Sequence, residues 1–65
     1  MKKYRITQTL PDGKVITTEV NDDNIKSSIT ISIWAFVCKD SFRSLTYVSG
    51  AGEDIMTYKV ERIDI

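Results

Sequence analysis

The chain has 65 residues, with nine Lys or Arg against nine Asp or Glu, no His and a single Cys. This length allows one domain, residues 1–65, and the counts exclude a Ser–His or Cys–His catalytic pair, an internal disulfide and a Cys/His zinc site. The lone cysteine and the lack of an apolar run of about eighteen residues lead us to expect a cytoplasmic protein that is not an enzyme, with no cofactor, no metal and no membrane segment.

The first predicted element is a strand over residues 4–10, in which apolar side chains alternate with polar ones. Pro11, Asp12 and Gly13 follow, and this combination is typical of a tight turn because proline presets φ and glycine accepts a positive φ. Residues 14–20 are rich in Val, Ile and Thr, which favours a returning strand. The chain is therefore predicted to begin with a β-hairpin.

Residues 21–40 decide the fold, because their pattern fits either a strand or a helix. Isoleucines at alternate positions over 29–38 suit a strand. At helical spacing, however, the apolar side chains form one buried stripe: Ile25, Ile29, Ile33 and Phe36. The Asn and Asp run over 21–24 is typical of a helix start, and about fifteen residues without Gly or Pro exceed a usual strand. We predict a helix over 23–38.

Such a helix carries a second apolar set roughly opposite the first: Ile31, Trp34, Ala35 and Cys38. One small sheet cannot cover both sides of a helix, so this set predicts self-association as a homodimer, with Trp34 near its centre. Since apolar residues precede Cys38, we expect its thiol to be buried and unreactive.

The strand pattern returns over residues 42–48 and 55–63, separated by a glycine-containing turn. The predicted fold is α+β, with the order β-hairpin, helix, β-hairpin (ββαββ) and a four-stranded, mainly antiparallel sheet. The alternative is an all-β, five-stranded small barrel or meander in which residues 29–38 form the central strand.

Charge is distributed unevenly along the chain. Residues 1–14 contain four basic residues and one acidic residue, a balance of +3, whereas residues 53–65 contain four acidic and two basic residues, a balance of −2. Opposite charges stabilise neighbouring strands modestly, so we expect these two segments to pair in the sheet.

Three functional hypotheses follow. The first is a small non-enzymatic protein-binding module that occupies a surface of an unidentified macromolecular partner. The second is a sheet that binds nucleic acid through tyrosines and basic residues: Lys3, Tyr4, Arg5, Arg43, Tyr47, Tyr58, Lys59 and Arg62. The zero net charge, and the phase of Tyr4 with Ile6, favour instead tyrosines that pack beneath the helix. The third is an inhibitor encoded by a phage or mobile element, which only the small size and charged composition suggest.

Overall fold

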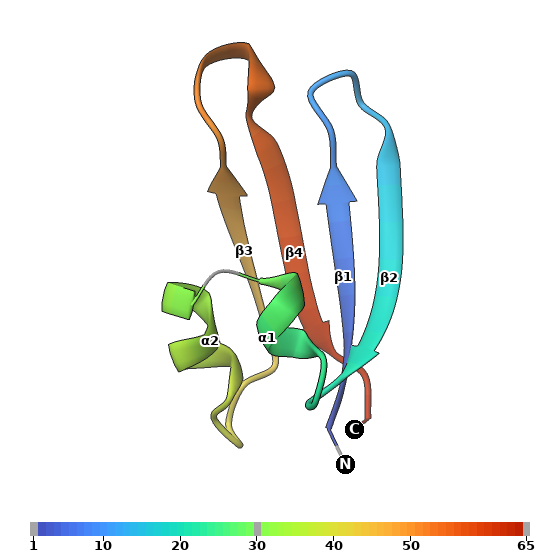
Figure 1. Ribbon diagram of the computed structural model, residues 1–65. Helices are drawn as coiled ribbons and strands as arrows, with labels where there is room; N and C mark the ends of the chain where they lie inside the picture. Colours follow the sequence, from blue (N-terminus) through green and yellow to red (C-terminus); the bar gives the residue numbers. More distant parts are fainter. Residues whose placement is uncertain (1, 30, 65) are drawn as a thin grey trace.

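Over the residues that the structure describes, 2–29 and 31–64, four strands form one antiparallel sheet and two short helices pack on one of its faces (Figure 1). In this computed structural model the elements are β1 (Lys3–Thr9), β2 (Val15–Asn21), α1 (Ile25–Ser28), α2 (Ile31–Val37), β3 (Ser44–Ser49), the 3-10 turn η1 (Gly52–Asp54) and β4 (Met56–Arg62). The strand order is β2-β1-β4-β3. The predicted ββαββ fold is confirmed with a divided helical segment, and the five-stranded alternative is wrong.

Strand β1 lies inside the sheet, between β2 and β4. The register places Arg5 opposite Glu19 of β2 and opposite Glu61 of β4. The Arg5 guanidinium lies 3.5 Å from the Glu19 carboxylate and 3.7 Å from that of Glu61. The basic start of the chain therefore pairs with its acidic end, as the charge distribution predicted. These ion pairs are partly exposed, so each contributes at most about 1 kcal/mol.

The predicted turns form at the expected glycines. Gly13 has φ 91°, and the Lys14 amide donates a hydrogen bond of 2.9 Å to the Asp12 carboxylate, which closes the first hairpin. Gly50 has φ 111°, and a Cβ at this position would collide with the carbonyl oxygen of Asp54. Glycine is therefore required at Gly50 for both its dihedral angle and its close approach to the backbone.

The polar run before α1 forms a turn. The Asn21 side-chain oxygen accepts hydrogen bonds from the Asp23 and Asn24 amides at 3.0 and 3.2 Å. Asn24 occupies the N-cap position, but its side chain makes no capping hydrogen bond. The helix starts where the Asn and Asp run predicted, through an Asx-type turn rather than a side-chain cap.

The helical segment is interrupted at Ile29, whose backbone is extended with φ −134° and ψ 165°. The Ser27 and Ser28 hydroxyls donate to the Asn24 carbonyl at 2.8 and 3.3 Å, and such local bonds compete with regular helix hydrogen bonding. Serine and isoleucine also have weak helix propensity. The helix predicted over 23–38 is therefore divided into α1 and α2.

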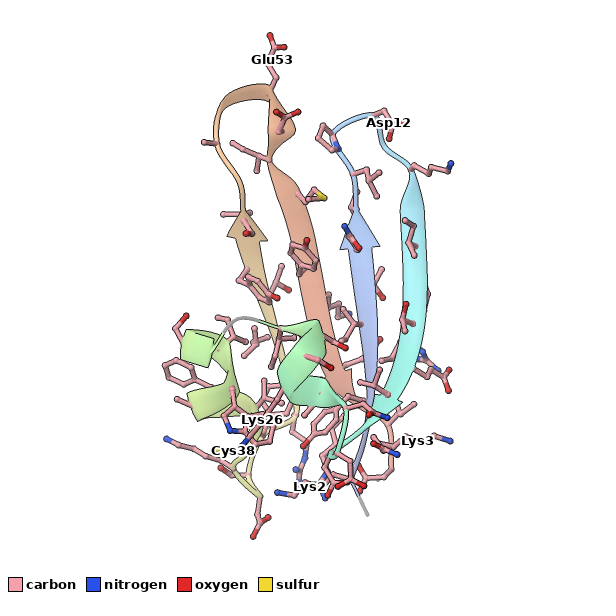
Figure 2. The ribbon with its side chains drawn as sticks, viewed as in Figure 1. Lys2, Lys3, Asp12, Lys26, Cys38 and Glu53 are labelled. Atoms are coloured by element: carbon pink, nitrogen blue, oxygen red, sulfur yellow. The ribbon has the colours of Figure 1, made fainter. Side chains whose placement is uncertain are left out.

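The core lies between the helices and one face of the sheet. Its buried side chains come from β1, α1, α2 and β4 and from the segments that follow the two helices: Tyr4, Ile6, Ile25, Ile29, Val37, Phe42 and Val60. The helices cover only the end of the sheet at which β1 begins and β4 finishes (Figure 1). The hairpin turns, marked by Asp12 and Glu53, project from the opposite end (Figure 2). The molecule is consequently elongated, with extents of 36 × 20 × 18 Å.

The interruption at Ile29 changes which side chains of α2 face the sheet. Val37 is fully buried, whereas Phe36 is 58% exposed. The Tyr4 hydroxyl donates to the Val37 carbonyl at 3.3 Å and joins α2 to β1. The prediction that Phe36 continues the buried stripe is wrong, because that stripe assumed one unbroken helix.

Candidate binding surface

Exposed apolar and aromatic groups gather on the outer side of α2. Ala35, Phe36 and Cys38 are exposed, while Trp34 is partly buried and packs against the core. Of the predicted self-association residues, Trp34 thus contributes only part of its side chain to the surface, and the side chain of Ile31 lies outside the described residues. We define the α2 surface as Trp34, Ala35, Phe36 and Cys38.

Two lysines frame the α2 surface. The Lys26 ammonium lies 5.3 Å from the centroid of the Trp34 ring, and the Lys39 ammonium lies 5.9 Å from that of Phe36. Both distances allow cation–π attraction. Because Lys26 belongs to α1, its contact also links the two helices. The result is an aromatic surface with positive charge at its margins.

Lys2 fixes the chain at the end of α2. Its ammonium donates to the Cys38 carbonyl at 2.9 Å and lies 2.9 Å from the Asp40 carboxylate. The hydrogen bond and charge of Asp40 raise the pKa of Lys2, and Lys2 in turn lowers the pKa of Asp40. Figure 2 labels Lys2, Lys26 and Cys38 at the helical end of the molecule. This contact orients the last turn of α2 relative to β1.

Cys38 does not occupy the core. It is exposed, and its thiol donates to the Ala35 carbonyl at 3.7 Å. The expectation of a buried cysteine is therefore wrong, because the displaced helix phase brings Val37 rather than Cys38 against the sheet.

The residues of the nucleic-acid hypothesis lie in separate places. Strand register puts the tyrosines on the helix-covered face, and three basic side chains of β1 and β4 on the opposite face: Lys3, Arg5 and Lys59. Arg62 pairs with Tyr4 in the register and shares the tyrosine face. Tyr4 is fully buried, and burial raises its pKa, as predicted for a tyrosine beneath the helix. The sheet therefore separates Lys3, Arg5 and Lys59 from the tyrosines.

Arg43 and Arg62 are engaged in local contacts. Arg62 is 2.7 Å from the Asp64 carboxylate and donates to the Asp40 carbonyl at 3.0 Å. The hydrogen bond to Asp64 raises the pKa of Arg62, and the same bond holds the pKa of Asp64 well below its ordinary value. Arg43 donates to the carbonyls of Asp40 and Phe42 at 3.4 and 3.1 Å.

A hollow of about 180 Å³ lies between α1 and the sheet, lined by Ser27, Ser28, Ile29, Tyr47, Ser49 and Tyr58. The Tyr47 and Tyr58 rings stack with centroids 5.1 Å apart and an interplanar angle of 12°. Burial raises the pKa of Tyr47. Among the described residues the lining consists of neutral hydroxyl-bearing side chains and one isoleucine, with no carboxylate or cation for acid–base chemistry.

Within residues 2–29 and 31–64, no group of three or more His, Cys, Asp or Glu side chains is placed to hold a metal ion. In the same part of the chain, no helix has the length and apolar character needed to cross a membrane.

Sequence reasoning missed Phe36 and Lys26 as surface residues. The signal was present in Ser27, Ser28 and Ile29, whose weak helix propensity indicates a break that shifts the phase of α2.

Comparison with protein families, curated proteins and solved structures gives no match to this chain.

Proposed function

We propose that the chain is a small non-enzymatic protein-binding module that acts as a homodimer and occupies a surface of a macromolecular partner. The observation that carries the proposal is the Phe36 ring on α2, which is 58% exposed although the chain has few buried apolar side chains. Aromatic side chains surrounded by smaller apolar groups are common anchors of protein interfaces. The partner surface therefore offers an apolar recess for Phe36.

The positive charge at the margins of the α2 surface indicates the charge of the partner. Lys26 and Lys39 lie at the margins of the α2 surface, next to the Trp34 and Phe36 rings. Cations at an interface rim favour acidic groups on the other protein and mainly accelerate association. We assign the α2 surface to a partner whose apolar recess has an acidic border. The proposal places the module in the cytoplasm, where an exposed, unpaired Cys38 stays reduced.

The test compares proteins captured from a nuclease-treated lysate of the organism that encodes the chain. The baits are the wild-type chain, Phe36→Ser and the control Val48→Ser, which alters an apolar residue that is 67% exposed on β3. We expect the wild type and Val48→Ser to retain the same protein and Phe36→Ser to lose it. Equal retention by all three baits contradicts the proposal.

A second arm addresses nucleic acid. Labelled single- and double-stranded oligonucleotides are titrated with the chain at two salt concentrations, because phosphate-driven binding weakens steeply with salt. We expect no salt-dependent binding. Binding that Lys59→Ala weakens would favour the nucleic-acid hypothesis over the protein-binding proposal.

A further inference from the structure

Strand β2 is an edge of the sheet without the usual protection against pairing. It runs for seven residues, its first five residues are exposed, and its sequence VITTEVN contains no Pro, Gly or Lys. Natural edge strands are commonly protected by lysine, proline, bulges or short length. Its single charged residue, Glu19, is already paired with Arg5 on β1. The outer backbone of β2 is therefore suited to receive another strand.

Hydrogen bonds at the two ends of the first hairpin identify the backbone groups that face outward. The Leu10 amide donates to the Lys14 carbonyl at 2.8 Å, and the Asp22 amide donates to the Lys2 carbonyl at 3.1 Å. In an antiparallel ladder the direction of hydrogen bonding alternates with each residue. Even-numbered residues of β2 therefore bond toward β1, and the amides and carbonyls of the odd-numbered ones point away from it: Val15, Thr17 and Glu19. The Asn21 carbonyl already accepts a hydrogen bond from the Asn24 amide at 3.2 Å.

We propose that two copies of the chain pair antiparallel along β2, about a two-fold axis at Thr18, and form one continuous sheet. This register places Thr17 opposite the partner's Glu19, so the outward backbone groups of both residues bond across the interface. It also places Ile16, which is 44% exposed, opposite the partner's Val20 on the helix side of the sheet. The interface thus joins backbone pairing with contact between apolar side chains.

Charge complementarity selects this register. Centring on Thr18 places Lys14 opposite the partner's Asp22, once at each end of the paired strands. A register centred on Glu19 would oppose two glutamates, and one centred on Thr17 would place Lys14 opposite the partner's Val20. Neither alternative pairs Lys14 with an acid.

The other edge strand, β3, lacks this complementarity when it pairs with itself about Thr46. The Arg62 amide donates to the Arg43 carbonyl at 2.8 Å, so the even-numbered residues of β3 point outward. Self-pairing centred on Thr46 places Arg43 opposite the partner's Ser49, with no opposite charge at either end. The inference rests on the proposed function for its homodimer and identifies β2, rather than α2, as the contact between copies.

Sedimentation equilibrium of the full chain tests the pairing. Proline at position 17 removes an outward amide of β2 while sparing the bonds to β1, and Thr46→Pro makes the matching change on the other edge. We expect the wild type and Thr46→Pro to be dimers and Thr17→Pro to be a monomer with an unchanged far-ultraviolet circular dichroism spectrum. A dimeric Thr17→Pro overturns the inference, and so does a monomeric Thr46→Pro.

Charge variants test the register even if Thr17→Pro fails to fold. Lys14→Glu places two acids opposite each other at both ends of the pairing. We expect it to weaken the dimer about tenfold, because an attractive cross-strand charge pair becomes repulsive at each end. Adding Asp22→Lys to this variant restores opposite charges and should restore dimerisation. Equal dimerisation of the wild type and both variants contradicts the register.

Phe36→Ser separates this inference from the proposed function. We expect it to remain a dimer while losing partner capture. A monomeric Phe36→Ser would place the contact between copies on α2 and overturn the β2 pairing alone. A monomeric wild type that still captures a partner through Phe36 would overturn the pairing and the homodimer, and leave the binding proposal standing. Partner capture that is independent of Phe36, by a chain that dimerises through β2, would overturn the binding proposal and leave the β2 pairing standing.

Discussion

Val60 provides the sharpest test of how this small domain is stabilised. Its side chain is 0% exposed, and its neighbours across β1 and β3 are Ile6 and Leu45. Val60→Ala removes two methyl groups from this position. The matched change, Val48→Ala, removes the same groups from a side chain that is 67% exposed on the same sheet.

The two substitutions should lower the free energy of unfolding by amounts that differ severalfold. Loss of two buried methyl groups removes about 1.6 kcal/mol of transfer free energy. A residual cavity of about 50 Å³ adds about 1 kcal/mol, which gives a total of about 2.5 kcal/mol for Val60→Ala. Val48→Ala should cost at most about 0.5 kcal/mol, as is usual for exposed positions. A domain of this size rarely has more than about 3–5 kcal/mol in total, so Val60→Ala removes about half of it.

Urea unfolding followed by circular dichroism measures the difference. With a slope of about 1 kcal/mol per molar urea, the urea midpoint for Val60→Ala should fall by about 2.5 M, and that for Val48→Ala by at most about 0.5 M. All chains are compared at one protein concentration, because dimerisation couples stability to concentration. Equal midpoint shifts for the two variants would refute the placement of the core on the helix side of the sheet.

Other changes test single contacts. Tyr4→Phe leaves the Val37 carbonyl without its donor and should lower the free energy of unfolding by about 1 kcal/mol; an unchanged urea midpoint would contradict this hydrogen bond. Gly50→Ala should lower the melting temperature more than Gly13→Ala, because only at Gly50 does the added Cβ meet a backbone carbonyl, and equal losses would argue against that close approach. The lowered pKa of Asp64 means that its carboxylate stabilises the fold above its ordinary pKa of 3.8, and that this stabilisation is lost as the pH falls below that value. Wild-type melting temperatures should therefore decline more steeply than those of Asp64→Asn in an acid titration, and parallel curves would count against the Arg62 contact.

The strands were predictable because their signals are local. Pro11, Asp12 and Gly13 specify a turn by their own dihedral preferences, and the alternating side chains beside them match one covered face of a sheet. The pairing of β1 with β4 was also accessible, since the opposite charges of Arg5 and Glu61 meet across it. The order of the strands was not predicted, because several antiparallel arrangements satisfy the same alternation.

The helical segment could be predicted only in outline. Its length without Gly or Pro favoured a helix over a single strand, but the position of the break depends on competition between helix packing and the Ser27 and Ser28 hydroxyl bonds. That competition is decided by the three-dimensional contacts of Ile25 and Ile29 with the sheet, which the sequence pattern does not specify. The residues of α2 were therefore placed in a helix but with the wrong phase, so that Phe36 was assigned to the buried stripe and the Cys38 thiol was expected to be buried.

The partial cover of the sheet divides each strand into two mechanical regions. Near Tyr4 and Val60 the helices cover one face of the strands, whereas near Thr9 and Met56 the helix layer has ended (Figure 1). Amide hydrogen exchange should consequently slow down along β1 from the first hairpin turn toward Tyr4, and along β4 from η1 toward Val60. Thermal opening of the sheet then begins at the hairpin turns and proceeds toward the end that the helices cover.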